Sequence, residues 1–149
     1  MENRFTKKAQ NALALAVNVA EEFGYTYIGS EHLLLGLAEE SDSIASKMLQ
    51  KKGMNYQKIK KELFRDSPQK NKSSLSSKNI TPRVRRIIEG SHRLSEQNSQ
   101  HYIGSEHLLY SLLSENDCMA VHVLEQNGVY VHELKNDILT FIQSSKKPL

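Results

Sequence analysis

The sequence predicts an all-α protein built from two pseudo-symmetric four-helix repeats, about eight helices in all. The segment YIGSEHLL occurs twice, at residues 27–34 and 102–109, an offset of 75. The same offset holds without a gap along most of the chain and matches apolar positions to apolar positions. This indicates one supersecondary unit copied once. Apolar residues recur at the three- and four-residue spacing of helices, and no segment shows convincing strand alternation.

The offset also predicts the domain organisation. We expect a first repeat over residues 1–65, a connector over 66–80, a second repeat over 81–143 and a tail or linker start over 144–149. The connector is rich in serine and lysine and has almost no apolar residues. We therefore expect it to be exposed and mobile. Two like units pack most simply face to face about an approximate two-fold axis.

The first two helices are predicted from caps and spacing. Thr6 can accept a hydrogen bond from a first-turn amide, and Gly24 suits a left-handed helix end. The apolar face between them is rich in alanine, so a neighbouring helix can approach closely. Ser30 is the expected N-cap of the second helix, which ends near Glu40. Glu31 then lies in the first turn, where the helix dipole favours a carboxylate.

Two shorter helices complete the first repeat. Asp42 or Ser43 can cap the third helix, which Gly53 ends, and Asn55 can cap the fourth. The fourth helix turns an apolar face inward and three lysines outward: Lys58, Lys60 and Lys61.

The second repeat follows the same plan. Thr81 is a predicted cap followed by a proline, which suits the first helical position. Ser105 is the expected cap of the next helix, with Glu106 in its first turn. Asp117 can cap the third helix, which Gly128 ends. The last helix carries the apolar positions up to 142.

Composition limits the function classes. No apolar run approaches the roughly 20 residues needed to cross a bilayer, and the N-terminus opens no apolar signal segment. We therefore expect a cytoplasmic protein without a membrane partner. Cys118 is the single cysteine, so it cannot form an internal disulfide, and its apolar surroundings favour buried packing over a nucleophile.

Catalysis and metal binding are not favoured by the repeated motif. Ser30, Glu31 and His32 are adjacent on a helix, where neighbouring side chains point about 100° apart and cannot form a relay among themselves. A metal site shared with Glu106 and His107 would lack the usual ligand spacings. We expect no enzyme activity, no cofactor and no metal in this domain. A metal-dependent hydrolase centred on the two histidines is the weakest alternative.

A nucleic-acid-binding helical regulator is the stronger alternative. Its contacts would be the arginines of the second repeat, Arg83, Arg85, Arg86 and Arg93. The equivalents of the first three in the first repeat are Lys8, Gln10 and Asn11. The basic cluster is therefore not part of the repeated design, and a solvated helix face is favoured over a recognition helix. The net charge of +3 is too mild to change this.

The repeated features that remain suit binding. Helix N-termini present free amides that favour a phosphate or carboxylate, and a carboxylate nearby suits a guanidinium. A ligand carrying both groups would match a pocket made of both. The plainer interpretation is that the polar residues only cap helices and complement dipoles, and without a family resemblance we would favour it for Thr6, Ser30, Glu31, Thr81, Ser105 and Glu106.

The chain resembles the Clp N-terminal repeat domain in three sets of residues: RFT at 4–6 with AQ at 9–10, GSEHLL in both repeats, and TPR at 81–83. It is most similar to the N-domain of the ClpC branch of AAA+ unfoldases, over about residues 4–142. The resemblance implies a non-catalytic domain that docks adaptor proteins and protein substrates for a hexameric unfoldase ring and its protease. Any ATPase modules would lie beyond residue 149, although small free-standing proteins with this domain also exist.

The resemblance also implies a ligand. In the ClpC branch this domain recognises phosphorylated arginine on marked proteins. Carried over, Glu31 and Glu106 would contact the guanidinium, and Thr6 and Thr81 would lie on the phosphate side. The family usually has threonine in place of the two serine caps that would line the site, Ser30 and Ser105. The lysines of the fourth helix, Lys60 and Lys61, are a further departure that could change adaptor choice.

Overall fold

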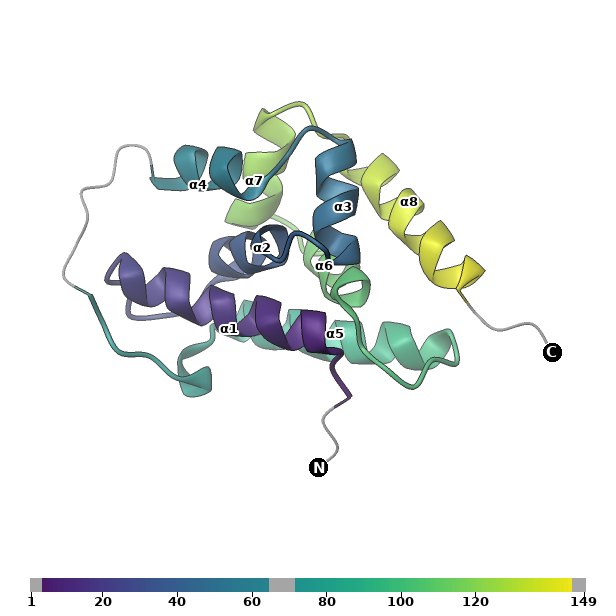
Figure 1. Cartoon of the computed structure of the whole chain (residues 1–149), viewed down its shortest axis with the longest axis horizontal. Coiled ribbons are helices and arrows are strands. Elements are labelled where there is room, and N and C mark those ends of the chain that lie inside the picture. The colour runs from purple at the N-terminus through teal and green to yellow at the C-terminus, as the bar shows by residue number, and fades with distance from the viewer. Residues whose placement is uncertain (1–3, 65–71, 146–149) are drawn as a thin grey trace.

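The computed structural model describes residues 4–64 and 72–145. Within these ranges the chain forms eight α-helices and one 3-10 turn, and isolated bridges are the only β pairing. The elements are α1 (Lys7–Glu22), α2 (Ser30–Glu39), α3 (Ile44–Lys51), α4 (Tyr56–Phe64), η1 (Ser77–Asn79), α5 (Pro82–Gln97), α6 (Ser105–Leu113), α7 (Met119–Gln126) and α8 (Val131–Ser144). The all-α prediction is confirmed (Figure 1).

Side-chain caps begin four helices as predicted. Oγ1 of Thr6 accepts the amide of Ala9 at 3.1 Å. Thr81 repeats this bond at 3.1 Å, with a proline at the first helical position. Ser43 accepts from an amide of α3 at 3.1 Å, and Asn55 from an amide of α4 at 2.9 Å. Each bond satisfies an amide that has no partner inside its helix.

The prediction that Ser30 is the N-cap of α2 is wrong. The N-cap of α2 is Gly29, and Ser30 is already helical. Nδ1 of His32 accepts the Gly29 amide at 2.9 Å, as the third residue of a capping box does. The second repeat does the same with Gly104 and His107, at 2.8 Å. The helix start is therefore set by glycine and histidine, not by serine.

The other predicted serine cap, Ser105, serves a different helix. Its Oγ accepts the amide of Ala45 at 3.0 Å, which lies in the first turn of α3 of the other repeat. Asp117 is also not a cap, because α7 begins after Cys118 and has no side-chain cap bond. Asp117 instead has a φ of +54°, a left-handed conformation that aspartate tolerates better than most residues. Cys118 is buried, as predicted.

Two bridges between the repeats are related by the repeat offset. Phe5 pairs with Ile103, and Ile28 pairs with Ile80. Adding 75 to the first residue of either pair gives the second residue of the other. The lead-in to α1 therefore lies beside the lead-in to α6, and the lead-in to α5 beside that to α2. This exchange indicates an approximate two-fold relationship between the repeats.

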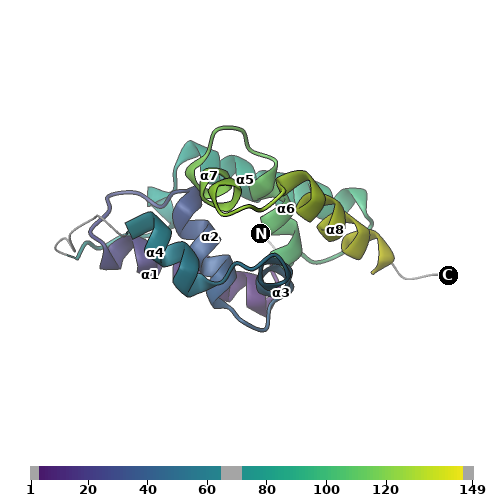
Figure 2. The same cartoon turned by 90° about the horizontal axis from the view of Figure 1, so that it is seen from above.

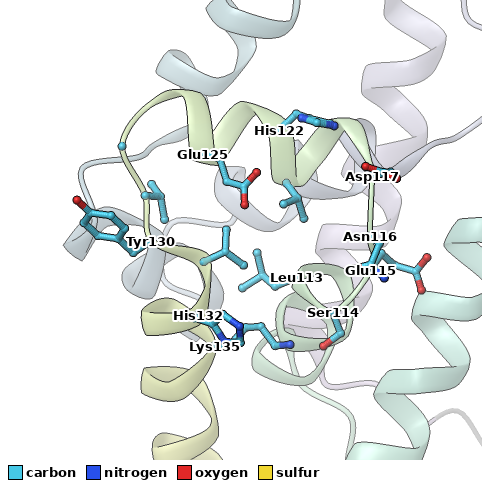
Figure 3. A pocket seen from close by; sticks show the side chains of 14 residues that line it. Leu113, Ser114, Glu115, Asn116, Asp117, His122, Glu125, Tyr130, His132 and Lys135 are labelled. Carbon is cyan, nitrogen blue, oxygen red and sulfur yellow. The ribbon is translucent and has the colours of Figure 1, made fainter.

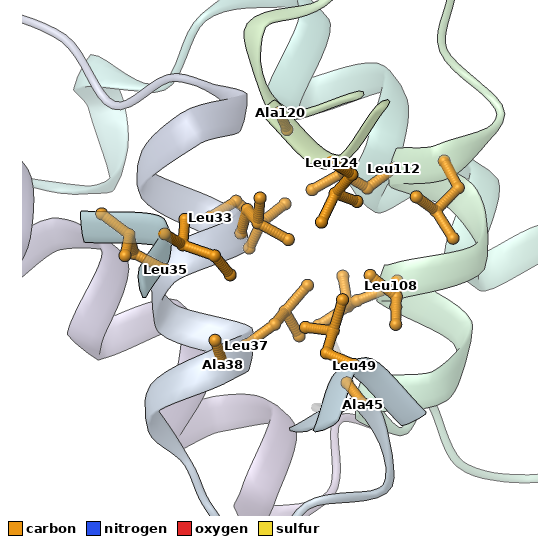
Figure 4. Packing of buried hydrophobic residues seen from close by; sticks show 14 of the residues in the cluster. Leu33, Leu35, Leu37, Ala38, Ala45, Leu49, Leu108, Leu112, Ala120 and Leu124 are labelled. Atoms are coloured by element: carbon orange, nitrogen blue, oxygen red, sulfur yellow. The ribbon is translucent and has the colours of Figure 1, made fainter. Parts of the chain in front are cut away.

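The core lies between the two central helices and the short helices that cover them. In Figure 1, α1 and α5 run along one edge, α2 and α6 lie at the centre, and α3, α4, α7 and α8 lie opposite. Figure 2 shows the helices of the first repeat along one side and those of the second along the other. Leu33, Leu37, Leu108 and Leu112 are at most 1% exposed and converge at the centre (Figure 4).

The predicted close approach of a helix to the alanine face of α1 is confirmed. Ala9, Ala12 and Ala16 are buried, and α2 presents Gly36 to them. A Cβ built on Gly36 would lie 2.1 Å from the carbonyl oxygen of Ala12. Only a glycine fits this crossing.

The described part of the connector is mostly exposed, and it hydrogen-bonds to the end of α1. The predicted boundary at 65–66 and the stretch to 71 lie outside the described residues. The amide of Ser73 donates to the carbonyl of Glu21 at 3.1 Å, and the amide of Leu75 to the Glu21 carboxylate at 2.8 Å. The second half of the connector is thus fixed to the end of α1. No helix of the described chain is long and apolar enough to cross a membrane.

Candidate functional site

Two equivalent surface hollows contain the residues predicted to bind. The Glu106 hollow, of about 270 Å3, is lined among others by Thr6, Lys8, Asp42, Tyr102, Ser105 and Glu106. The Glu31 hollow, of about 320 Å3, is lined by the equivalents at the repeat offset, Thr81, Arg83, Asp117, Tyr27, Ser30 and Glu31. Each hollow therefore combines the threonine of one repeat with the glutamate of the other.

The two carboxylates are held against their own helix starts. Glu106 is 3% exposed, and Glu31 is partly buried. A Cβ on Gly104 would lie 2.4 Å from Oε1 of Glu106, and a Cβ on Gly29 would lie 2.7 Å from Oε1 of Glu31. The glycines thus leave room for carboxylates that also accept their own backbone amides. Burial raises the pKa of both carboxyls, and these amide bonds oppose the rise.

A tyrosine borders each carboxylate. The Tyr27 hydroxyl donates to Glu31, and the ring carbon Cε1 would lie 3.2 Å from a Cβ built on the intervening Gly29. Burial, then the charge of Glu31, raises the pKa of Tyr27, and burial and Glu106 act in the same order on Tyr102. Both rings are more than a third exposed. An aromatic ring beside a carboxylate suits a planar cation.

Each hollow is also lined by a basic residue and a threonine-capped helix start. Nζ of Lys8 lies 3.3 Å from Oε2 of Glu40, and a guanidinium nitrogen of Arg83 lies 3.3 Å from Oε1 of Glu115. The threonine hydroxyl that caps the helix accepts an amide and keeps its own proton to donate. Lys8 and Arg83 are already paired with acids, so it is the helix start that favours an anion in each hollow.

The motif histidines are structural. His32 and His107 are 0% exposed, and burial lowers the pKa of each to about 4, with Arg4 contributing at His107. Nε2 of His107 lies 2.6 Å from Oε1 of Gln100. Nε2 of His32 has no hydrogen-bond partner in the described structure, and its ring packs edge-on against Tyr25 at 4.6 Å. Both rings are neutral near pH 7 and orient the glycine turn.

The arginines of α5 do not form a free basic face. Arg83 and Arg86 share Oε1 of Glu115, at 3.3 and 3.2 Å, and both line the Glu31 hollow. Arg85 and Arg93 are exposed. The structure therefore places Arg83 and Arg86 in ion pairs beside the hollow and leaves only Arg85 and Arg93 of the predicted nucleic-acid cluster outside these pairs, which weakens that alternative. Among the described residues, no three histidine, cysteine or acidic side chains gather as metal ligands would.

A larger hollow contains none of the residues predicted to bind. It measures about 940 Å3 and lies between the α6–α7 loop, α7 and the start of α8 (Figure 3). Sequence analysis did not assign Lys8, Tyr27 or Tyr102 to the two equivalent hollows, and it considered Arg83 as a nucleic-acid contact instead. Both tyrosines open the repeated octet, so the repeat itself carried the signal for them.

The family follows from this sequence and geometry. The profile of the Clp repeat (R) N-terminal domain matches residues 4–126 and 79–148. This chain belongs to the Clp repeat N-terminal domain family. It is 35% identical over 146 residues to the negative regulator of genetic competence ClpC/MecB of Bacillus subtilis and 34% identical over 146 residues to the chaperone ClpB of Oceanobacillus iheyensis. These alignments cover 98% of the chain but only 18% of either relative.

Solved Clp N-domains have the same fold. The N-terminal domain of ClpD from Arabidopsis thaliana matches with a TM-score of 0.78 and 25% identity, over 94% of this chain and 95% of that one. The Hsp104 N-terminal domain of Candida albicans matches with a TM-score of 0.76 and 13% identity, over 97% and 95%. The all-helical Clp N-domain architecture implied by the sequence resemblance is thus confirmed.

Proposed function

We propose that this domain is a non-catalytic docking module of a Clp-type ATP-dependent unfoldase, which receives adaptor proteins and protein substrates and binds phosphorylated arginine in its two hollows. The family supports the docking role, and a ClpV N-domain of similar fold has been solved in complex with a VipB peptide. The unfoldase ring and its protease would be supplied by other polypeptide segments. The proposal includes a cytoplasmic location and no nucleic-acid partner.

One observation carries the ligand assignment. Each hollow brings together a carboxylate, a threonine-capped helix start and a basic side chain. In phosphoarginine the phosphoryl group is bonded to a guanidinium nitrogen, so the anion and the cation are neighbours. A site for it needs an acceptor for N–H groups beside donors for phosphoryl oxygens, which is the combination each hollow contains.

The roles of the residues follow from their chemistry. Glu106 would accept guanidinium N–H groups, with Tyr102 against the guanidinium plane. Thr6 and the first amides of α1 would donate to the phosphoryl oxygens, with Lys8 nearby. Because Glu106 is only 3% exposed, a ligand must enter the hollow to reach it. Burial strengthens the charge pairing once water is excluded.

Calorimetric titration of free phosphoarginine into the domain tests the ligand. We expect saturable binding by the wild type and at least a tenfold loss of affinity in the double variant Glu31→Ala, Glu106→Ala. Arginine and inorganic phosphate, titrated separately, should bind far more weakly than phosphoarginine. No heat with the wild type, or an unchanged affinity in the double variant, would reject phosphoarginine binding and leave adaptor docking to be tested with intact partner proteins.

A further inference from the structure

A third surface differs between the repeats and has the character of a docking groove. This α4 groove, of about 650 Å3, is lined by Phe23, Asn55, Gln57, Lys58, Lys60, Lys61 and Phe64. Its volume falls within the range of about 300–1,000 Å3 typical of ligand clefts. It shares no lining residue with the Glu31 or the Glu106 hollow. It is therefore a separate surface.

The repeat shows that the fold does not require these residues. Adding 75 to Phe23, Phe64, Lys58, Lys60 and Lys61 gives Asn98, Leu139, Glu133, Lys135 and Asn136. The second repeat thus builds the same helix with one lysine, one acid and no aromatic residue at these positions. Its acid, Glu133, is paired with Lys52 at 2.7 Å. The aromatic and basic character of the α4 groove belongs to the first repeat alone.

The lysines of the groove lack acidic partners. Within the described ranges, no ion pair involves Lys58, Lys60 or Lys61. Nζ of Lys58 reaches only the carbonyl of Gly53, at 3.5 Å. Nζ of Lys60 lies 5.6 Å from the ring centroids of both Phe23 and Tyr56. α4 carries these three lysines against one acid, Glu62, so it keeps a net positive charge that favours an acidic partner.

The aromatic rings leave only their edges to the groove. Phe23 and Phe64 stack at 4.2 Å with an interplanar angle of 12°, and His32 stacks on Phe64 at 6.3 Å and 15°. Lys60 lies over Phe23. Because the ring faces are taken by neighbours, no face is open for a nucleobase to stack on, as single-stranded nucleic acid would need. Ring edges and lysine stems instead suit an apolar side chain.

We propose that the α4 groove docks an acidic peptide segment of a partner protein, with an apolar side chain against the Phe23–Phe64 pair and flanking carboxylates on Lys58, Lys60 and Lys61. Charge complementarity selects the segment, and the apolar contact fixes its register. This docking is independent of phosphoarginine binding because the two use different residues.

Fluorescence anisotropy with a defined probe tests the groove. The probe is a labelled peptide of aspartates and glutamates around one central leucine, at physiological salt. We expect saturable binding by the wild type and at least a tenfold loss in Lys60→Glu with Lys61→Glu. The matched control is Lys135→Glu, which reverses the charge of the lysine equivalent to Lys60. Nζ of Lys135 lies 5.2 Å from the ring centroid of Tyr110. The control variant should change affinity less than twofold.

Further variants of the probe and of the protein separate the apolar contribution from the charged one. Replacing the central leucine of the probe by serine should weaken binding several-fold. The variant Phe64→Leu, which introduces the residue found at the equivalent position of the second repeat, should lose most of this preference for leucine over serine. Glu31→Ala with Glu106→Ala should bind the probe as the wild type does. Absence of saturable binding, an equal loss in Lys135→Glu, or tighter binding of a single-stranded oligonucleotide than of the probe would overturn the proposal. Unchanged thermal midpoints of the lysine variants would show that they remain folded.

Discussion

The amide of Thr6 donates a hydrogen bond to the carbonyl of Ile103, 2.9 Å away. This bond joins the residue that caps α1 to the residue just before the GSEHLL turn of the other repeat. The bond from Thr81 to Ile28 repeats it at 3.1 Å. Because both lead-ins are exchanged in this way, neither hollow can form within a single repeat.

The exchange predicts how variants combine. We expect two phosphoarginine sites in each chain and one in Glu106→Ala, measured as calorimetric stoichiometry. The remaining site is then the Glu31 hollow, whose threonine is Thr81. Adding Thr81→Ala should weaken the remaining site at least fivefold, whereas adding Thr6→Ala should leave it unchanged.

Stability sets the control for that experiment. Each threonine variant removes a helix cap and should cost about 1 kcal/mol of unfolding free energy, so both double variants should be destabilised alike. If Thr6→Ala weakened the remaining site as much as Thr81→Ala, the assignment of one threonine from each repeat to the glutamate of the other would be wrong.

The features that the sequence predicted correctly are those that depend on hydrogen bonds between residues close in the chain. The caps Thr6 and Thr81 were recoverable because a hydroxyl and an amide three residues apart form the bond wherever the helix begins. Ser30 was misassigned because His32 competes for the same turn and accepts the Gly29 amide, which moves the start of the helix back by one residue. This competition depends on the burial of the ring, which spacing does not reveal.

The sequence could not predict which elements of the two repeats contact one another. The repeat gives the same motif to both halves, and it does not say whether Thr6 faces Glu31 or Glu106. That choice is made by the bridges between lead-ins, which are contacts distant in sequence. The stack of Phe23 on Phe64 is of the same kind, because it depends on how α4 crosses the end of α1.

Substitution of Gly36 tests the close crossing of α1 and α2. Its added Cβ would lie 2.1 Å from the Ala12 carbonyl and 3.0 Å from the Ala16 amide, which are backbone atoms. Because backbone cannot rotate away, we expect Gly36→Ala to cost about 3 kcal/mol in urea unfolding. In Gly90→Ala the nearest atom is the Ser111 hydroxyl, at 2.4 Å, which can rotate. An equal, small cost for both variants would contradict the close packing.

The buried bond between His107 and Gln100 provides another test. Gln100→Ala would leave Nε2 of His107 without its partner in a site that is 0% exposed. An unsatisfied buried group costs about 2 kcal/mol, so the unfolding free energy should fall by about that amount. The control is Gln97→Ala, an exposed residue of α5, which should shift stability by less than about 0.5 kcal/mol. Equal stability of the two variants would show that the bond does not contribute.

The motif histidines predict how stability depends on pH. Burial lowers the pKa of His32 and His107 to about 4, whereas in the unfolded chain a histidine has a pKa of about 6.5. Between these values the unfolded state binds protons that the folded state does not, so acidification lowers stability across this window. At about 1.36 kcal/mol for each pKa unit, the loss approaches roughly 3 kcal/mol for each histidine.

The motif glutamates act in the opposite direction. The folded-state pKa values of Glu31 and Glu106 are raised, so the folded state binds their protons at a higher pH than the unfolded chain does. Their protonation therefore favours the folded state within the same window and offsets part of the loss. Urea unfolding from about pH 7 down to about pH 4 measures the net slope. His107→Gln, which keeps an acceptor for the Gly104 amide but cannot titrate, should reduce the slope by about half, whereas His122→Gln, at an exposed site, should not change it. A slope that His107→Gln leaves unchanged would mean that the buried ring titrates as it does in the unfolded chain.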